Sequence, residues 1–145
     1  MEYITNGEEE TQELGRRLGE RLGPGAVVAF TGDLGAGKTA FTRGLAQGLG
    51  IQERVTSPTF TIVNEYEGGR LPLFHFDMYR LASSEELFDI GWEDYLVRGG
   101  VCAVEWSENV ADALEDDAVR VEIRRGDGDD QRRIHVTNAP DLGEC

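Results

Sequence analysis

The chain has 145 residues, of which 39% are hydrophobic and 29% charged, a composition typical of a globular domain and not of a disordered chain. No apolar run approaches the roughly 18 residues of a membrane span, the acidic N-terminus is unlike a secretory signal, and two cysteines do not make a disulfide framework. The net charge of −14 argues against tight, direct binding to nucleic acid. We therefore expect a cytoplasmic protein with one domain over residues 1–145, frayed over 139–145.

The N-terminal half of the chain alternates between helix and strand patterns. Regularly spaced leucines predict the first helix, and a capping-box pattern of Asn6 and Glu9 marks its start. A short apolar run after Gly25 is typical of a buried parallel strand. In order, the predicted elements are a helix over 7–22, a strand over 26–31, a loop over 32–37 and a helix over 38–49.

The C-terminal half contains mostly strand patterns. Alternating apolar residues around glycine-containing turns predict hairpins, and Ser83 with Glu86 forms a capping box for a short helix. The predicted elements are a strand over 60–66, a turn over 67–70, a strand over 71–77, a helix from Ser83 to before Gly91, a strand over 101–105, and a hairpin of strands near 119–123 and 134–136. This order predicts an α/β fold with three layers, in which a mixed sheet has a parallel core and two antiparallel hairpins.

The loop between the first strand and the second helix carries a phosphate-binding motif. Its residues fit the pattern G-x-x-x-x-G-K-[ST] and are Gly32, Asp33, Leu34, Gly35, Ala36, Gly37, Lys38 and Thr39. Glycines allow the backbone to curl so that successive N–H groups point at one anion, and the helix N-terminus adds its dipole. We expect Lys38 to reach the β- and γ-phosphates and Thr39 to place its hydroxyl on Mg²⁺. The fold is therefore predicted to be a P-loop NTPase-like domain.

The lysine content supports the phosphate-binding motif and indicates which nucleotide base is bound. Lys38 is the only lysine in a chain with 14 lysines and arginines, and a compact ammonium suits a phosphate. Guanine-selective GTPases carry an Asn-Lys-x-Asp loop, which a chain with no other lysine cannot contain. ATP is therefore the expected nucleotide, bound through adenine preference or through low base selectivity.

Two acidic residues follow apolar strands, where a P-loop protein needs a carboxylate on the metal side. Glu105 ends a wholly apolar strand and is the first candidate, and Asp77 ends the strand that contains His75. Because the chain is so acidic, either acid could follow its strand by chance and have no role in the site. Asp77 could alternatively form a structural ion pair with Arg80. His75 is expected to be a packed or hydrogen-bonded strand residue and not a metal ligand.

The segment from Thr56 to Thr59 lies where GTPases carry a switch loop that senses the γ-phosphate. On the residues alone, a plain loop with a Ser-Pro turn is an equally good interpretation. The segment is therefore a candidate switch whose role the sequence leaves open.

Taken together, the motifs resemble one family over residues 7–136: TsaE, also called YjeE, the small ATPase of bacterial threonylcarbamoyladenosine (t6A) tRNA modification. The resemblance lies in four blocks that occur in the family's order and spacing. These blocks are Gly32–Thr39, Ser57–Phe60, His75–Leu81 and Val104–Trp106.

This resemblance implies roles for individual residues. Lys38 and Thr39 would bind phosphate and Mg²⁺, Glu105 would be a metal-side or catalytic acid, and Asp77 would lie at the nucleotide. Ser57–Phe60 would act as a switch-like loop. Thr11 and Arg132 match family positions that touch the nucleotide from outside the P-loop. Family members commonly have a second threonine after the P-loop threonine, whereas this chain has Ala40, which puts any hydroxyl role there in doubt.

The resemblance also implies a function: an ATP-hydrolysing subunit that acts on a TsaD–TsaB complex, slow alone, stimulated by its partners, and in contact with tRNA only indirectly. Two alternatives stay open. A small-molecule kinase is disfavoured because no lid-like insertion follows Gly50, and a non-catalytic adaptor would bind ATP without turnover. The acidity fits docking on a basic partner face, although it could serve solubility alone.

Overall fold

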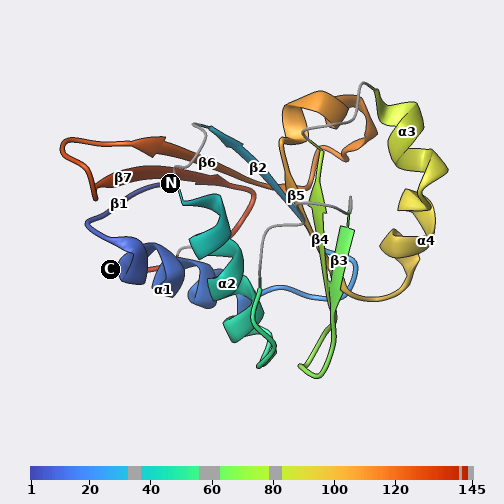
Figure 1. The fold of residues 1–145 in the computed structure, drawn as a ribbon, viewed down its shortest axis with the longest axis horizontal. Helices are drawn as coiled ribbons and strands as arrows, with labels where there is room; N and C mark the ends of the chain where they lie inside the picture. Colours follow the sequence, from blue (N-terminus) through green and yellow to red (C-terminus); the bar gives the residue numbers. More distant parts are fainter. Residues whose placement is uncertain (33–36, 56–62, 79–82, 141, 144–145) are drawn as a thin grey trace.

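A single seven-stranded sheet, in the order β1-β7-β6-β2-β5-β4-β3, organises the computed structural model (Figure 1). The structure describes residues 1–32, 37–55, 63–78, 83–140 and 142–143. The strands are β1 (Glu2–Thr5), β2 (Val27–Gly32), β3 (Val63–Tyr66), β4 (Leu73–Asp77), β5 (Val101–Glu105), β6 (Val119–Arg125) and β7 (Arg132–Thr137). The helices are α1 (Glu8–Gly19), α2 (Lys38–Gly48), α3 (Ser84–Asp89), α4 (Trp92–Val97) and the 3₁₀ helix η1 (Ser107–Ala113). No helix in this described part is long and apolar enough to cross a bilayer.

The centre of the sheet is parallel and its edges are antiparallel. β2 runs parallel to both β5 and β6, and β4 runs parallel to β5. β3 returns antiparallel to β4 on one side, while β7 pairs antiparallel with β6 and then with β1 on the other. The prediction of a mixed sheet with a parallel core and two hairpins is confirmed.

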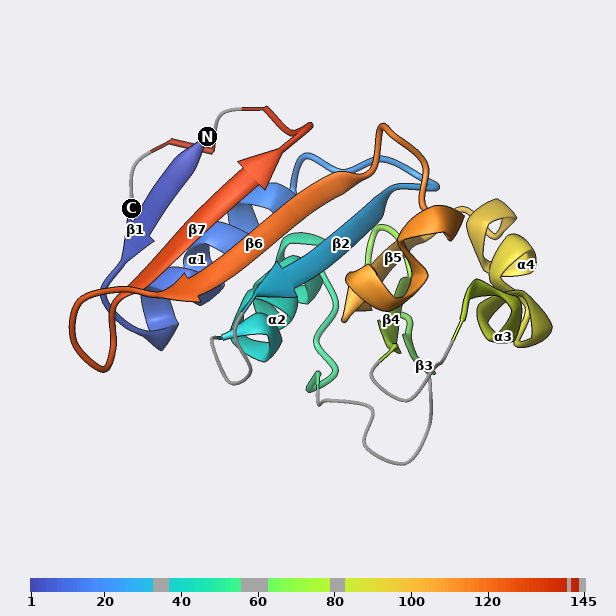
Figure 2. The same cartoon turned by 90° about the horizontal axis from the view of Figure 1, so that it is seen from above.

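Helices cover the two faces of this sheet and make the expected three layers (Figures 1 and 2). Neighbouring residues of β2 point to opposite faces, so Phe30 joins the core under α1 and α2 whereas Ala29 joins a second core with Trp92 of α4. The first core also contains Leu14 of α1 and Phe41 of α2. The alternation within one buried strand therefore serves both cores at once.

Several elements differ from the sequence-based expectation. The N-cap of α1 is Gly7, and Asn6 instead donates its backbone N–H to Glu10 Oε1 at 3.4 Å, so the capping box predicted for Asn6 and Glu9 was wrong. The sequence patterns also missed β1, α4 and η1. Of the predicted strand over 60–66, residues 60–62 lie outside the described part and 63–66 form β3.

The C-terminal segment makes contacts with the N-terminal part of the domain. Leu142 is buried, and its backbone N–H donates to the Tyr3 hydroxyl at 3.0 Å. The Leu142 carbonyl accepts a hydrogen bond from Arg17 on α1 at 3.2 Å. Leu142 is thus held against β1 and α1 within the segment that we expected to be frayed.

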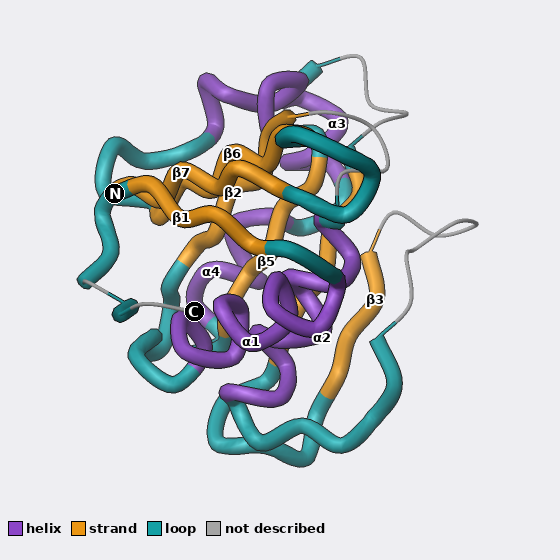
Figure 3. The backbone as a smooth tube through the Cα atoms, turned by 90° about the vertical axis from the view of Figure 1, so that its left-hand side faces the viewer, coloured by secondary structure: helices purple, strands orange, loops and turns teal. Residues whose placement is uncertain are grey.

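Helices α1 and α2 lie side by side with glycines between their backbones (Figure 3). A Cβ atom added to Gly15 of α1 would lie 2.2 Å from the Phe41 carbonyl oxygen, and one added to Gly44 of α2 would lie 2.0 Å from the Gln12 carbonyl oxygen. Gly19 and Gly48 have equally close neighbours. Since α2 begins at Lys38, this backbone contact fixes the helix that carries the lysine predicted to bind phosphate.

We predict that Gly44→Ala destabilises the domain, although alanine normally stabilises a helix interior by about 1 kcal/mol relative to glycine. The added methyl group would overlap the α1 backbone, and overpacking of this kind costs roughly 1–3 kcal/mol. The free energy of unfolding from urea titration measures the effect. Gly23→Ala is the control, because nothing lies within 4 Å of a Cβ atom at Gly23. A Gly44→Ala variant as stable as the wild type would contradict the prediction.

Candidate functional site

Two glycines flank the phosphate-binding loop. Gly32 ends β2 with φ 121°, and a Cβ atom there would lie 2.0 Å from the Ile123 carbonyl oxygen of β6. Gly37 is the N-cap of α2 with φ 106°. Both backbones therefore require glycine. The residues predicted between them, Asp33, Leu34, Gly35 and Ala36, lie outside the described part of the chain.

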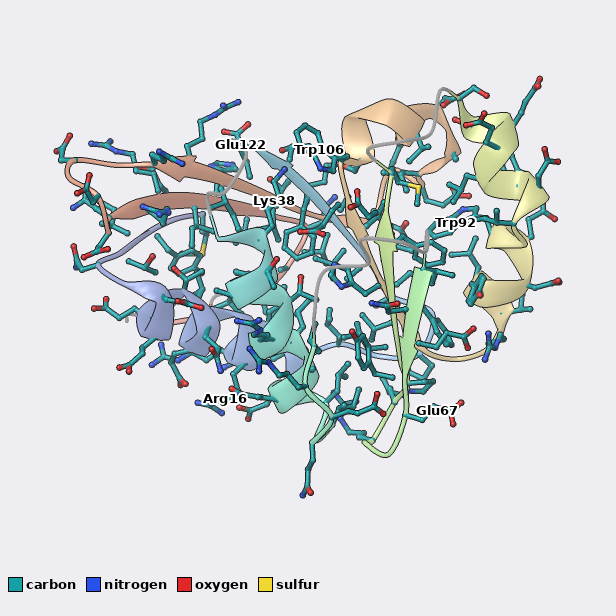
Figure 4. The ribbon with its side chains drawn as sticks, viewed as in Figure 1. Arg16, Lys38, Glu67, Trp92, Trp106 and Glu122 are labelled. Atoms are coloured by element: carbon teal, nitrogen blue, oxygen red, sulfur yellow. The ribbon has the colours of Figure 1, made fainter. Side chains whose placement is uncertain are left out.

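Lys38, the first residue of α2, is 7% exposed. Its Nζ atom has no hydrogen-bonding partner among the described residues. The ammonium lies 4.3 Å from the ring centroid of Trp106, a cation–π contact that offsets part of the cost of burial (Figure 4). A buried ammonium at a helix N-terminus, with no acceptor among the described residues, is an arrangement that an incoming anion would stabilise.

Trp106 follows β5 directly and has a strained backbone. Its φ of 58° lies in the left-handed region, which a bulky side chain rarely adopts. The next residue, Ser107, donates its hydroxyl to the Phe30 carbonyl of β2 at 3.0 Å and so anchors the start of η1 to the central strand. These constraints hold the indole ring against Lys38.

The two candidate acids end neighbouring parallel strands. Asp77 of β4 and Glu105 of β5 are directly opposite one another in the register. Because β2, β4 and β5 run parallel, both acids lie at the carboxyl edge of the sheet, where β2 leads into the phosphate-binding loop. Asp77 is half-buried, and its suggested partner Arg80 lies outside the described residues.

Glu105 is nearly buried, at 5% exposure, and its Oε2 atom lies 3.1 Å from His75 Nε2. His75 is fully buried on β4, which confirms that it is a packed, hydrogen-bonded strand residue. Thr39, the second residue of α2, is half-buried beside Lys38. Among the described residues there is no group of three or more His, Cys, Asp or Glu side chains that could hold a metal.

Thr11 lies beside the end of the phosphate-binding loop. It is buried on α1, its Oγ1 donates to the Gly7 carbonyl at 3.2 Å, and the Thr5 and Thr11 hydroxyls are 2.7 Å apart. The Thr11 methyl group is the nearest atom to a Cβ added at Gly37, at 3.7 Å. The helix contact between α1 and α2 thus brings a residue far from the motif against the motif's last glycine.

Arg132 begins β7 at the same edge of the sheet, but its guanidinium binds the β6–β7 turn. Its backbone is opposite Thr5 in the β1–β7 register. Its Nη1 donates to the carbonyls of Asp129, at 2.7 Å, and Gln131, at 2.9 Å, within the β6–β7 turn. The structure thus places Lys38 and Thr39 at the start of α2, Thr11 beside Gly37 and Glu105 at the carboxyl end of β5, while Arg132 Nη1 binds carbonyls of the β6–β7 turn.

Two contacts of this site were not predicted from the sequence. One is the stacking of Lys38 on Trp106, and the other is the pairing of His75 with Glu105. His75 and Asp77 are two residues apart on β4 and so lie on one face of the sheet, a signal that the histidine lies near the candidate acids. Cys102 of β5 is not part of this chemistry, because burial raises the pKa of its thiol to about 12 and keeps it protonated.

Comparisons with known proteins agree in pointing to one family. The family model described as "Threonylcarbamoyl adenosine biosynthesis protein TsaE" matches residues 5–134. The protein named "tRNA threonylcarbamoyladenosine biosynthesis protein TsaE" in Bacillus subtilis is 43% identical over 94% of this chain and 85% of that protein. Its namesake in Treponema pallidum is 47% identical over 86% of this chain and 91% of that protein. The crystal structure of YdiB from Bacillus subtilis superposes with a TM-score of 0.79 and 38% identity, over 97% of this chain and 86% of that one.

We predict that MgATP changes the fluorescence of Trp106, because phosphate would draw the Lys38 ammonium away from the indole ring. Lys38→Ala should weaken the apparent ATP affinity more than about tenfold, from the value of a hydrogen bond to a charged group. Fluorescence titration of the wild type with MgATP measures the first effect, and calorimetric titration of both proteins with MgATP measures the second.

The second tryptophan supplies the control. Trp92 packs edge-on against Phe76 in the other core, at a centroid distance of 5.2 Å. Trp92→Phe should keep the ATP-dependent signal and Trp106→Phe should lose it. A signal that persists in Trp106→Phe, or wild-type affinity in Lys38→Ala, would contradict the assignment of Lys38 to the phosphates.

Proposed function

The chain belongs to the TsaE family, and we propose on this premise that it is the ATP-binding and ATP-hydrolysing subunit of the t6A tRNA modification machinery, acting on a TsaD–TsaB complex. The observation that carries the nucleotide-binding part is the buried Nζ of Lys38, without a partner among the described residues, at the N-terminus of α2. The pathway and the partners are inferred from membership of the family. The protein itself would bind no tRNA tightly, because its net charge is −14.

In this proposal the loop and the helix N-terminus hold the triphosphate. Backbone N–H groups of residues 32–37 would face the phosphates, and Lys38 would contact the β- and γ-phosphates. Thr39 and Glu105 offer a hydroxyl and a carboxylate, the oxygen ligands that Mg²⁺ prefers, so the residues present fit this ion. Bound Mg²⁺ would neutralise charge on the phosphates.

Glu105 and Asp77 would supply the negatively charged groups of the site. Glu105 is the first candidate to orient the attacking water or the metal, because it ends β5, the strand that pairs with β2, at the carboxyl edge of the sheet. Asp77, opposite Glu105 in the register, would lie at the nucleotide. Thr11 would contact the nucleotide beside Gly37, whereas Arg132 would first have to release the turn carbonyls that it now binds.

We propose that turnover depends on partners because no arginine finger, an arginine that stabilises the charge of the transferred phosphate, is identified in the described part of the chain. Arg43 of α2 donates to the Val55 carbonyl at 2.9 Å and lies 3.5 Å from Glu8. Phosphoryl transfer is slow without a cation that stabilises the charge of the transition state. A basic face of the TsaD–TsaB complex would dock on this acidic protein and supply or order the missing group.

We therefore predict slow phosphate release by the isolated protein and a steep rise when purified TsaD and TsaB are added. A finger supplied in trans is worth roughly 10³–10⁵ in rate. The measurement compares phosphate release with and without saturating partners at low salt, and Lys38→Ala in the same mixture controls for contaminating ATPases. An unchanged rate together with no detectable association would refute partner stimulation and direct attention to a phosphate acceptor, as for a kinase.

We also predict that Glu105→Gln lowers turnover by about 100-fold or more while sparing ATP affinity, because one electrostatic contact to the transition state has this value. Turnover in the assembled system and fluorescence titration measure the two quantities. Glu122→Gln is the control, since Glu122 is exposed on β6 beside Arg124. Wild-type turnover in Glu105→Gln would make Glu105 a structural residue.

A further inference from the structure

A buried histidine next to the candidate acid has no role in the mechanism described so far. His75 is fully buried on β4, and its Nε2 atom lies 3.1 Å from Glu105 Oε2. Its other ring nitrogen, Nδ1, is buried without a hydrogen-bonding partner among the described residues. The four other residues of β4 are the apolar Leu73, Phe74 and Phe76, and Asp77 at its end. A polar ring in the middle of this strand therefore requires an explanation.

The contacts of the ring indicate which nitrogen carries the proton. A proton on Nδ1 would be a buried donor without an acceptor among the described residues, and the lone pair of Nε2 would then face the lone pairs of the carboxylate. A proton on Nε2 removes both costs, because Nε2 donates to Glu105 and Nδ1 is left as an unprotonated acceptor. The geometry thus favours a hydrogen bond that Nε2 donates to Glu105 Oε2.

The sheet register fixes the direction of this hydrogen bond. His75 is opposite Ala103 of β5, and Glu105 lies two residues further along that strand, opposite Asp77. The imidazole therefore reaches from inside the sheet toward the edge at which Glu105 ends β5. It approaches the carboxylate from the protein interior and engages one of its two oxygens, Oε2.

Stability alone is a poor reason for such a pair. Replacing a buried polar or charged pair with well-packed apolar residues is often neutral or stabilising. The neighbouring positions of β4 and β5 are filled with apolar side chains, so the core offers no general need for a histidine. What the pair does provide is a carboxylate of fixed orientation at 5% exposure.

We propose that His75 is a positioning residue, which holds Glu105 through Oε2 so that Oε1 faces the triphosphate. This inference rests on the proposed function, in which Glu105 is the acid on the metal side. Hydrogen-bonding partners behind such an acid set its orientation, and their loss typically costs 10- to 100-fold in activity. Without the imidazole, the buried carboxylate would lose its donor and could rotate away from the nucleotide.

The test compares His75→Leu, which removes the donor at similar volume, with His75→Gln, whose amide nitrogen can take the place of Nε2. In the assembled system with TsaD and TsaB, we expect kcat of His75→Leu to fall by roughly 10- to 100-fold. ATP affinity from Trp106 fluorescence and the thermal unfolding midpoint should stay at their wild-type values. His75→Gln should restore most of kcat. His135→Leu, at the exposed second histidine, should behave as the wild type.

A double-mutant cycle then asks whether His75 acts through Glu105. We expect His75→Leu to have no further effect on turnover in the Glu105→Gln background, because the residue that it positions is already lost. Additive losses would overturn the proposal, as would wild-type turnover in His75→Leu. Equal loss of kcat, ATP affinity and thermal stability, unrescued by glutamine, would show a merely structural role.

Two further outcomes are distinguishable. If His75→Leu does not fold, His75→Gln and His75→Asn decide the matter, because both keep an amide and only glutamine can reach Glu105. Turnover in His75→Asn equal to that in His75→Gln would overturn the proposal. Absence of ATP binding and of turnover in the wild-type protein with its partners would instead refute the proposed function, independently of any His75 variant.

Discussion

The parallel pairing of β2, β4 and β5 is the constraint on which the rest of the site depends. Parallel strands end at one edge of a sheet. The direction of the strands therefore places the loop after β2 and the acids that end β4 and β5 at the same edge. Helix α2 must then cross back over the sheet from this edge, and its N-terminus points at the same space. The glycine contact with α1 fixes how closely that helix can lie.

The site concentrates polar groups that the cores exclude. Lys38, His75 and Glu105 are all buried, and two of these side chains have a nitrogen without a partner among the described residues. Each such group costs free energy that the two apolar cores must offset. The strained backbone of Trp106 adds to this cost. A ligand that supplies the missing hydrogen-bonding partners would therefore stabilise the folded protein.

Features with a local signal could be predicted from the sequence. The apolar run of β2, the glycines around the loop and Lys38 all lie within one short segment, and the hairpin strands alternate as expected. β1 has only four residues and is stabilised by β7 at the far end of the chain, so its signal is not local. The His75–Glu105 contact depends on the register between β4 and β5, which residue patterns do not give. Likewise, the left-handed conformation of Trp106 had no glycine to indicate it.

The burial of Lys38 has a consequence for handling the protein. The chain has no other lysine, and its terminal ammonium is partly buried and donates to the Val136 carbonyl at 2.8 Å. Within this sequence, reagents that couple proteins through amines, such as crosslinkers, fluorescent esters and activated sensor surfaces, therefore have Lys38 as their one lysine target. Attachment through Met1 would leave the proposed phosphate site free, whereas attachment through Lys38 would block it. An added tag avoids this conflict between immobilisation and ligand binding.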